Sequence, residues 1–467
     1  MSKAKSRNSF TGSLGFVLAA AGSAVGLGNI WRFPYLAAKD GGGLFLLVYL
    51  VLALTFGFTL LTSEIAIGRK TKQSPLTAYS RLKKGWDGLG ILGSIVPFMI
   101  LPYYCVIGGW VLKYFMAFAM GQGELAAEDG YFTGFITDHI EPIIMTYIFL
   151  IVCAVVIIYG VNSGIEKTSK ILMPALLIMI VGIAVFSMTL SNTNEAGEKV
   201  TGLDGMKVYL VPDFEHVTLK SFFTTVMDAM GQLFYSLSVA MGIMITYGSY
   251  VKDKENLSKS INQIEIFDTI VAFLAGVMII PAVYVFMGTE GMSSGPSLMF
   301  VSLPKIFVSM GAVGQVVGAL FFAMVLFAAM TSAVSILEAI VSSLIDKFSL
   351  ERKMATIVET GIGLAIAIIV CLGYNLLYFD IKLPNGADAQ ILDILDYVSN
   401  NILMPVVAIG TCILVGWVIK PETVINEITK NGEKFRRKHL YIIMIKYVTP
   451  VLLIFLLLIS LGIIKLD

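Results

Sequence analysis

Long uninterrupted apolar stretches recur along this chain, and they limit its possible folds more than any other feature. A helix that spans a bilayer needs about 20 apolar residues, and a hydropathy scan separates eleven such stretches. They cover residues 14–38, 44–67, 89–120, 142–159, 171–190, 222–250, 261–287, 306–345, 356–379, 391–419 and 441–464. Continuous runs, without ten-residue alternation, exclude an outer-membrane barrel. The sequence predicts an all-α membrane protein with eleven transmembrane helices.

Composition agrees with a single polytopic domain over residues 1–467. Charged residues make up 14% of the chain, against about 25% in soluble domains, so the spans leave little sequence for a separate soluble domain. The net charge of +1 gives no indication of a nucleic-acid partner. The three histidines are scattered, and the four cysteines lie apart inside apolar stretches without metal-ligand spacing. We therefore expect core thiols at Cys105, Cys153, Cys371 and Cys412, and neither a metal cluster nor an enzyme active site.

The basic residues predict an orientation. If the amino terminus is cytoplasmic, 24 of the 33 Lys and Arg residues fall in cytoplasmic segments. The positive-inside rule favours that arrangement, which with eleven spans puts the carboxyl terminus outside. The prediction is a multi-pass protein of the cell (inner) membrane.

Glycines and hydroxyl residues interrupt the first and sixth spans at corresponding places. Glycine in a helix interior costs about 1 kcal/mol, and unwound backbone at bilayer depth survives only against protein or a polar cavity. Close packing of small residues is the alternative, to which Gly22 and Gly26 alone conform. The residues are Gly22, Gly26 and Gly28 in the first span, and Gly231, Tyr235, Ser236, Ser238 and Gly242 in the sixth.

Six charged residues fall within or at the ends of the spans. Each such charge costs a few kcal/mol to insert, so their number predicts an aqueous or ion pathway inside the helix bundle. They are Arg32, Glu64, Asp228, Asp268, Glu338 and Asp396.

The segment AGSAVGLGNIWRFPY at 21–35, followed by three glycines at 41–43, resembles the first-span signature of the neurotransmitter:sodium symporter family. Further similarities lie at Tyr103 and Tyr104, GQLFYSLSVAMG at 231–242, ITYGSY at 245–250 and AAMTS at 328–332. The bacterial leucine transporter is the type example of this arrangement. The resemblance implies an inverted repeat of spans one to five (12–190) and six to ten (222–420), with unwound first and sixth helices and an eleventh span (441–465) outside the repeat.

The resemblance also implies a sodium-coupled symporter that imports an α-amino acid by alternating access. Family members that carry monoamines have Asp at the position of Gly26, so here the substrate is expected to supply its own carboxylate. A large apolar or aromatic side chain is expected, because Met241 stands where the leucine transporter has Phe. An exporter or exchanger of aromatic amino-acid-derived metabolites on the same fold is the alternative. The implied substrate-binding residues are Ala24, Leu27, Gly28, Ile100, Tyr104, Tyr235, Ser236, Ser238, Met241, Ser332 and Ile336.

The resemblance also implies two sodium sites, at positions that match the family's sodium ligands. The first would use the carbonyl of Ala24 with the side chains of Asn29, Ser236 and Asp268. The second would use the carbonyls of Gly22, Val25 and Ala328 with the hydroxyls of Thr331 and Ser332. Bonding of these two hydroxyls to the preceding helical turn is the structural alternative.

No chloride is expected. Chloride-binding relatives use positions that match Tyr49, Gln232 and Ser236, but Asp268 stands here in place of Asn and Ala272 in place of a ligand. A fixed carboxylate would supply the balancing charge permanently. A structural cap or ion pair is the alternative role for Asp268.

The resemblance implies two gates, and two other features stay open. Arg32 with Asp396 would form the extracellular gate, with Tyr235 as an aromatic lid, and Arg7 with Asp346 would form the cytoplasmic gate. Ordinary interfacial charges are the alternative for Arg7 and Asp346. Gly164 and Pro174 enclose either a segment that unwinds or a structural glycine followed by a tolerated proline. Pro102 is expected to interrupt the third span. The partners implied are an amino acid and the lipid bilayer, and no feature indicates an oligomeric state.

Overall fold

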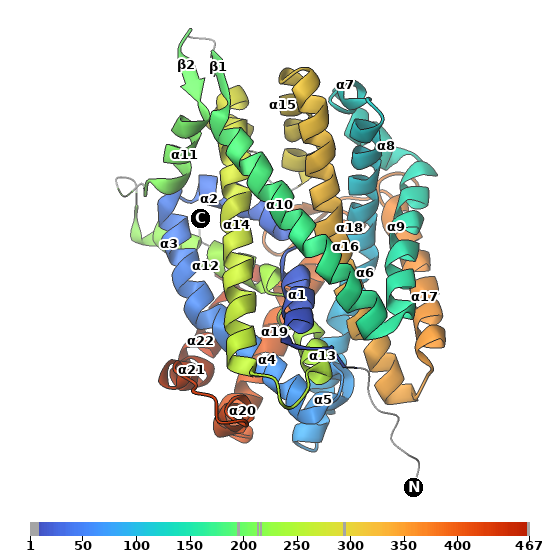
Figure 1. Ribbon diagram of the computed structural model, residues 1–467, viewed down its shortest axis with the longest axis vertical. Coiled ribbons are helices and arrows are strands. Elements are labelled where there is room, and N and C mark those ends of the chain that lie inside the picture. Colours follow the sequence, from blue (N-terminus) through green and yellow to red (C-terminus); the bar gives the residue numbers. More distant parts are fainter. Residues whose placement is uncertain (1–8, 194–196, 213, 215–216, 293–295, 465–467) are drawn as a thin grey trace.

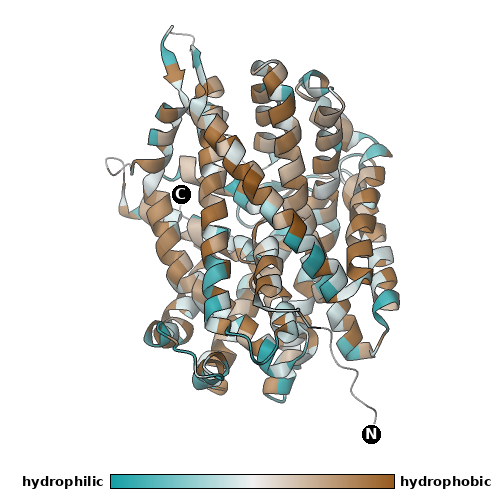
Figure 2. Cartoon of the chain, viewed as in Figure 1, coloured by the Kyte–Doolittle hydropathy of each residue, from teal (hydrophilic) through white to brown (hydrophobic). Residues whose placement is uncertain are grey.

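The computed structural model describes residues 9–193, 197–212, 214, 217–292 and 296–464. Most of its helices run side by side along the long axis of the molecule, and α10 crosses the front obliquely (Figure 1). Apolar residues cover the middle of the view, and hydrophilic residues gather toward its ends (Figure 2). In the described ranges, nine helices are long and apolar enough to cross a membrane, and a bent helix pair makes a tenth span.

The first half of the chain supplies five expected spans. Two of them contain wide π-helical turns, and a third begins with one. The elements are α1 (Ser13–Ala24), a π-turn (Gly28–Arg32) and α2 (Phe33–Lys39); α3 (Gly43–Leu52), a π-turn (Ala53–Gly57) and α4 (Phe58–Thr71); α5 (Pro75–Leu82); α6 (Asp87–Ala119); α7 (Gly123–Ala126); α8 (Tyr131–Thr137); α9 (Glu141–Ile158); and a π-turn (Val161–Glu166) with α10 (Lys167–Thr189).

The second half begins after a hairpin, β1 (Ser191–Thr193) with β2 (Lys199–Thr201), and α11 (Gly202–Leu210). Its elements are α12 (Leu219–Ser236), α13 (Ile243–Tyr250), α14 (Leu257–Met287), a 3₁₀ turn (Thr289–Gly291), a π-turn (Leu298–Ser302), α15 (Leu303–Ser309), α16 (Ala312–Phe348), α17 (Arg352–Leu372), β3 (Ile381–Lys382), β4 (Asp388–Ala389), α18 (Ile391–Asp396), a π-turn (Tyr397–Leu403), α19 (Met404–Ile413), a π-turn (Leu414–Val418), α20 (Glu422–Ile428), α21 (Lys438–Ile443), a π-turn (Met444–Val448) and α22 (Thr449–Ser460).

Local chemistry explains several helix ends. The Thr218 hydroxyl accepts the N–H of Ser221 at 3.0 Å and starts α12, and the Asn256 side chain accepts the N–H of Lys259 at 2.8 Å and starts α14. Both are side-chain caps of the type that helix starts favour. Lys72 ends α4 in the left-handed conformation, with φ of 53°.

Three expectations need correction. The predicted span 306–345 is divided, because Gly311 (φ 66°) separates the short helix α15 from the long helix α16. Helix α6 runs through Pro97 and Pro102 without a break, since neighbouring helices can compensate for a proline within a membrane protein. The two short hairpins β1–β2 and β3–β4 were not anticipated by the all-α prediction.

Packing places the broken helices at the centre. Helix α6 packs against α16, α4 against α13, and α10 against α14, while α1 contacts both α14 and α16. The four cysteines are buried and free, in agreement with core thiols. This arrangement surrounds the breaks in the first and sixth spans with protein on all sides.

Candidate functional site

Both glycine-rich spans are unwound. The two parts of the first span, Ser13–Ala24 and Gly28–Lys39, are bent by 56°. In the sixth, α12 ends at Ser236 and α13 begins at Ile243, and every second residue between them is left-handed, with φ of 52° at Ser238, 62° at Ala240 and 75° at Gly242. A non-glycine residue in this region costs about 1–3 kcal/mol and is typical of functional sites.

Hydrogen bonds hold the two breaks together. The Ser238 hydroxyl donates to the Ser23 carbonyl at 2.9 Å, and the Gln232 side chain donates to the Gly28 carbonyl at 3.1 Å. Glu64 of α4 accepts the backbone N–H of Ala240 at 2.6 Å. The unwound backbone therefore has polar partners supplied by side chains, as bilayer depth requires.

A buried carboxylate lies beside the breaks. Asp268 of α14 is fully buried, and its Oδ1 accepts hydrogen bonds from Ser236 Oγ at 2.7 Å and Asn29 Nδ2 at 2.9 Å. Tyr49 donates to the other oxygen at 3.4 Å. Within the described ranges no basic side chain forms an ion pair with Asp268, and its mid-helix position excludes a helix cap. A buried carboxylate without a cation is costly, so this cluster is suited to a bound cation.

At the second predicted cation site, one hydroxyl bonds to its own helix and the other bonds to α1. Thr331 donates to carbonyls of its own helix, those of Phe327 at 3.1 Å and Ala328 at 3.0 Å. Ser332 points across to α1, where it donates to the carbonyls of Ser23 at 3.1 Å and Gly22 at 3.4 Å. Back-bonding thus explains Thr331, whereas Ser332 joins the first span to α16.

The remaining predicted ligands lie at the end of α1. Ala24 is its last residue, and the next residue, Val25, is extended with its N–H bonded to the Ala21 carbonyl at 2.7 Å. Leu27 and Gly28 follow at the start of the π-turn. Extended backbone at this point ends the helical hydrogen-bond ladder, so carbonyls and N–H groups here lack regular helical partners.

A cavity lies between the breaks. Its lining contains the seven residues expected around a substrate side chain, together with Ser23 and Gly26; the seven are Ile100, Tyr104, Tyr235, Ser238, Met241, Ser332 and Ile336. Its volume is about 20 Å³, which is room for roughly one water molecule. A cavity of this size must widen to hold an amino acid.

The geometry around Gly26 concerns the substrate's polar end. A Cβ added to Gly26 would lie 3.0 Å from Ser332 Oγ and 3.2 Å from the Tyr104 hydroxyl. The Tyr104 hydroxyl is buried near Ser332 and the N–H of Leu27, but it completes a hydrogen bond to no described residue. An acceptor at this point would satisfy a donor that is otherwise unpaired.

Tyr235 covers the cavity. A Cβ added to Gly28 would lie 2.4 Å from Tyr235 Cδ1, so the ring rests directly on the break in the first span. Tyr235 also lines a larger cavity of about 290 Å³ that contains Arg32, Gly231 and Asn400. A side chain that borders both spaces has the position expected of a lid.

The structure describes both partners of only one of the two predicted gates. Arg32 is near enough to act electrostatically on Asp396, but the two form no ion pair in the described ranges, and Asp396 instead accepts Asn400 Nδ2 at 2.6 Å. On the other side, Asp346 accepts the N–H of Ser74 at 2.6 Å. Its predicted partner, Arg7, lies outside the described residues.

Close packing favours the structural reading of Gly164. A Cβ there would lie 1.9 Å from the Val156 carbonyl, so no larger residue fits this turn. Pro174 lies inside the continuous helix α10. Nearby, Glu166 accepts the N–H of Thr11 at 2.8 Å and pairs with Lys170 at 2.7 Å.

Two of the six intramembrane charges have structural partners. Glu338 accepts two hydrogen bonds from Arg352, at 2.6 and 2.8 Å, and one from the Tyr250 hydroxyl at 2.5 Å. Asp228 pairs with Lys39 at 2.7 Å. These two charges therefore do not need an aqueous pathway, which leaves Asp268, Arg32, Asp396 and Glu64 around the central site.

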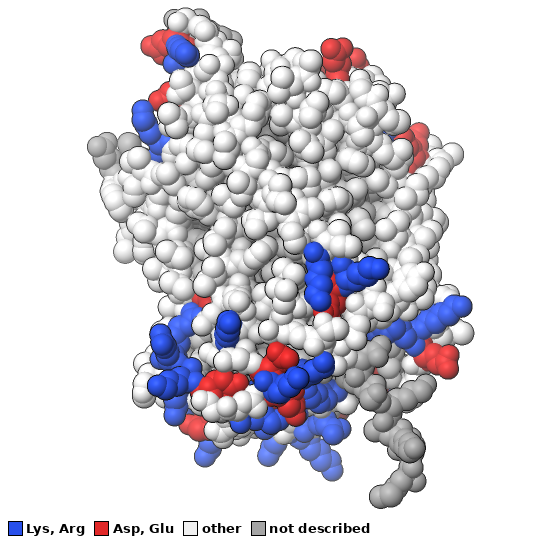
Figure 3. Space-filling view, in the orientation of Figure 1, with Lys and Arg blue, Asp and Glu red and all other residues white. Residues whose placement is uncertain are grey.

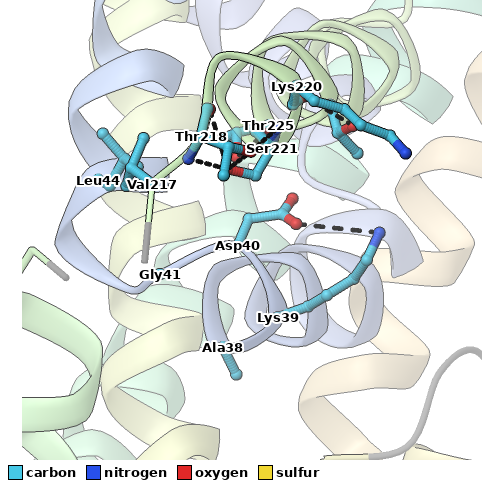
Figure 4. A pocket seen from close by; sticks show the side chains of 11 residues that line it. Ala38, Lys39, Asp40, Gly41, Leu44, Val217, Thr218, Lys220, Ser221 and Thr225 are labelled. Carbon is cyan, nitrogen blue, oxygen red and sulfur yellow. Dashed lines mark hydrogen bonds and ion pairs between the residues drawn. The ribbon is translucent and has the colours of Figure 1, made fainter. Parts of the chain in front are cut away.

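A separate pocket of about 500 Å³ opens between the end of α2 and the start of α12 (Figure 4). Asp40 projects toward it with a side chain only 6% exposed, 3.8 Å from Lys39 Nζ. Its Oδ2 has no hydrogen-bond partner in the part of the chain that is described. Burial raises the pKa of Asp40 to about 7; the Asp228 carboxylate adds to the rise, and Lys39 opposes it.

Sequence reasoning missed the residues that hold the site together. Ser23 and Gln232 join the two breaks, and Glu64 supports the unwound segment of the sixth span. Of these three, only Glu64 carried a sequence signal for such a role, as a charge inside an apolar stretch. The family resemblance relates Gln232 only to a chloride-binding position.

Comparison with known proteins agrees with this architecture. The family model for the sodium:neurotransmitter symporter family matches residues 7–126 and 136–466. A sodium-dependent transporter of Haemophilus influenzae is 33% identical over 434 residues, which are 90% of this chain and 91% of the relative. The sodium-dependent transporter YhdH of Bacillus subtilis is 31% identical over 463 residues, 97% of each chain.

Among solved structures, the crystal structure of MhsT in complex with L-phenylalanine is similar with a TM-score of 0.84 and 32% identity. The match covers 97% of this chain and 100% of that chain. The chain therefore belongs to the sodium:neurotransmitter symporter family, which confirms the expectation of a multi-pass membrane transporter rather than an enzyme.

Proposed function

We propose that this protein is a sodium-coupled symporter that imports an α-amino acid with a large apolar or aromatic side chain, by alternating access. The observation that carries the proposal is the small cavity between two broken helices, beside a buried carboxylate that forms no ion pair with a basic side chain in the described part of the chain. The names of both bacterial relatives describe sodium-dependent transporters, and MhsT was crystallised with L-phenylalanine. These findings support sodium coupling and an amino-acid substrate.

The substrate's carboxylate would bind where Gly26 leaves space. The Tyr104 hydroxyl and the N–H groups of Leu27 and Gly28 are the proposed donors, because the Tyr104 hydroxyl has no hydrogen-bond partner among the described residues and these N–H groups follow the helix break. An anion is also favoured at the amino-terminal end of a helical segment. The side chain would enter between Ile100, Met241 and Ile336, which are apolar.

Two sodium ions would travel with the substrate. Asp268, Asn29, Ser236 and the Ala24 carbonyl would hold the first, next to the substrate's carboxylate. Carbonyls of Gly22, Val25 and Ala328 with the hydroxyls of Thr331 and Ser332 would hold the second. Oxygen ligands suit a hard cation. Since Asp268 supplies a permanent negative charge, we expect no requirement for chloride.

Eleven spans and a cytoplasmic amino terminus complete the proposal. Residues 12–190 and 222–420 would form the two repeats, and α12 with α13 would form the sixth span. Lys and Arg gather at the lower end of the molecule in Figure 3, the end where α5, α20 and α21 lie in Figure 1. The positive-inside rule assigns such an end to the cytoplasm.

Uptake by proteoliposomes tests the proposal. With an inward sodium gradient, we expect saturable accumulation of radiolabelled Leu, Met, Phe, Tyr or Trp, and no accumulation without the gradient. Tryptophan should compete and tryptamine should not, because tryptamine lacks the carboxylate. Sodium-independent uptake, or equal competition by tryptamine, would contradict the proposal. Release of preloaded aromatic metabolites without amino-acid uptake would favour the exporter.

Charge movement tests the sodium stoichiometry separately. A zwitterion with two sodium ions carries two net charges, each worth about 2.3 kcal/mol per 100 mV of membrane potential. A potential that is negative inside, imposed with valinomycin, should therefore increase uptake at a fixed sodium gradient. Uptake that does not respond to the potential would show that the two-sodium assignment is wrong.

A further inference from the structure

A basic pocket lies away from the transport site, at the end of the molecule where Lys and Arg gather (Figure 3). Its volume is about 470 Å³, and it lies between the second expected span, the start of α14 and the loop between α20 and α21. Its lining includes four basic side chains and one acidic side chain. The charged residues are Lys259, Lys434, Arg436, Arg437 and Glu433.

Arg437 forms the fixed part of this pocket. It bonds to both oxygens of Glu265, at 2.6 and 2.9 Å, and to Asn262 at 2.6 Å. Its guanidinium lies 3.4 Å from the ring centroid of Phe58, and it donates to the Leu54 carbonyl at 3.2 Å. Leu54 belongs to the π-turn of the second span, so Arg437 ties the loop to both helices.

The other three basic side chains are exposed. Lys259, Lys434 and Arg436 form no ion pair with any described residue. Glu433, the acidic member, is already engaged by Asn431, whose N–H it accepts at 2.8 Å. These three positive charges form no ion pair in the described ranges, and together they outnumber the single negative charge of Glu433, so this part of the pocket keeps a net positive charge.

Apolar surface continues from the pocket into the membrane-spanning region. On α14, Ile266 lines the pocket, and Ile270 and Phe273 follow it as exposed residues at helical spacing. On the second span, Val51 and Leu54 are exposed just before Phe58, which lines the pocket. Helix α14 packs against this span at both the π-turn and α4. A charged pocket is thus continuous with two lipid-facing helix surfaces.

We propose that this pocket binds the headgroup of an anionic phospholipid, with the acyl chains along α14 and the second span. Basic pockets between membrane helices suit anionic headgroups, whose phosphate can accept hydrogen bonds from several Lys and Arg donors. A small soluble anion would use the same charges but not the exposed apolar residues beside them. The site is independent of the transport function and of which end of the molecule faces the cytoplasm.

Lipid binding to the purified protein tests the proposal. Binding of phosphatidylglycerol and of phosphatidylcholine in detergent is followed by native mass spectrometry and by the shift of Tm. The variant is K259Q/K434Q/R436Q, which leaves the Arg437 network intact. The control is R81Q/K83Q/K84Q, which removes the same charge from exposed positions outside this pocket.

We expect the unmodified protein and the control to bind phosphatidylglycerol and gain Tm. The pocket variant should bind it at least about tenfold more weakly, with an unchanged Tm in phosphatidylcholine that shows an intact fold. Equal lipid binding by all three proteins, or no preference for phosphatidylglycerol over phosphatidylcholine, would overturn the proposal. An equal Tm gain from glycerol phosphate alone would overturn it in favour of a soluble anion.

Discussion

The centre of the molecule and its outer rim handle charge differently. At the centre, Asp268 is fully buried, and Asn29 and Ser236 already bond to its carboxylate. At the rim, Arg32 acts electrostatically on Asp396, but the two form no ion pair among the described residues. Polar groups at the centre are therefore preorganised, whereas those at the rim are placed to change partners. We infer that central substitutions will affect ligand affinity and that rim substitutions will affect conformational change.

Asp268→Asn should produce the largest effect, a loss of at least about 100-fold in sodium-driven uptake, because an intramembrane cation would lose its counter-charge. Uptake is measured in proteoliposomes with chloride and with gluconate. Asp388→Asn on the exposed hairpin is the control and should transport normally. If replacing chloride by gluconate lowers uptake severalfold in the unmodified protein, Asp268 does not supply the balancing charge.

Ser332→Ala tests the second part of the centre. Loss of one hydroxyl ligand should weaken sodium binding about tenfold, in line with the strength of hydrogen-bonding contacts to charged groups. The sodium concentration that gives half-maximal substrate binding reports the change. Ser343→Ala, on the same helix, removes a hydroxyl that bonds only to its own helix and is the matched control. Identical sodium dependence in Ser332→Ala would remove this residue from the site.

Asp396→Ala tests the rim. Transport should fall about tenfold while equilibrium binding of substrate changes by less than about twofold, since closure needs the attraction to Arg32 in a space that excludes water. Scintillation proximity binding and proteoliposome uptake are measured on the same preparation. An unchanged uptake rate, or an equal loss of binding, would show that the contrast between centre and rim is false.

The smallest effect is expected from Asp40→Asn, also at the rim. The pKa of Asp40 is raised to about 7, above about 3.9 in an unfolded chain, so the folded state binds the extra proton between these values. Stability should therefore fall as pH rises from about 4 to 7, the full penalty remaining above 7. The variant removes this penalty, so its Tm should exceed that of the unmodified protein by a few degrees at pH 8 and approach it at pH 4. Lys39, Asp228 and Lys220 surround the group and stay unchanged. A Tm difference that is the same at both pH values would contradict the assignment.

Sequence could predict what is local and not what depends on packing. The glycines and hydroxyls of the first and sixth spans marked the breaks. The motif similarities predicted seven substrate-binding residues that line one cavity in the structure. The partnership of Glu64 with the N–H of Ala240 joins residues 176 positions apart and had no local signal. The predicted interruption at Pro102 was wrong, because the effect of a proline on a helix depends on the helices around it. Arg32 and Asp396 belong to elements far apart in the sequence, so their separation also depends on packing.

The contact between Tyr235 and Gly28 also offers an experimental tool. Gly28 has no positive φ, so alanine can adopt its backbone conformation, but the new methyl carbon would lie 2.4 Å from the resting position of the ring. Gly28→Ala should therefore force the ring aside and hold the site accessible, as a conformational trap. Cysteine labelling of the cavity wall in that variant would reveal whether one methyl group keeps the transporter from closing.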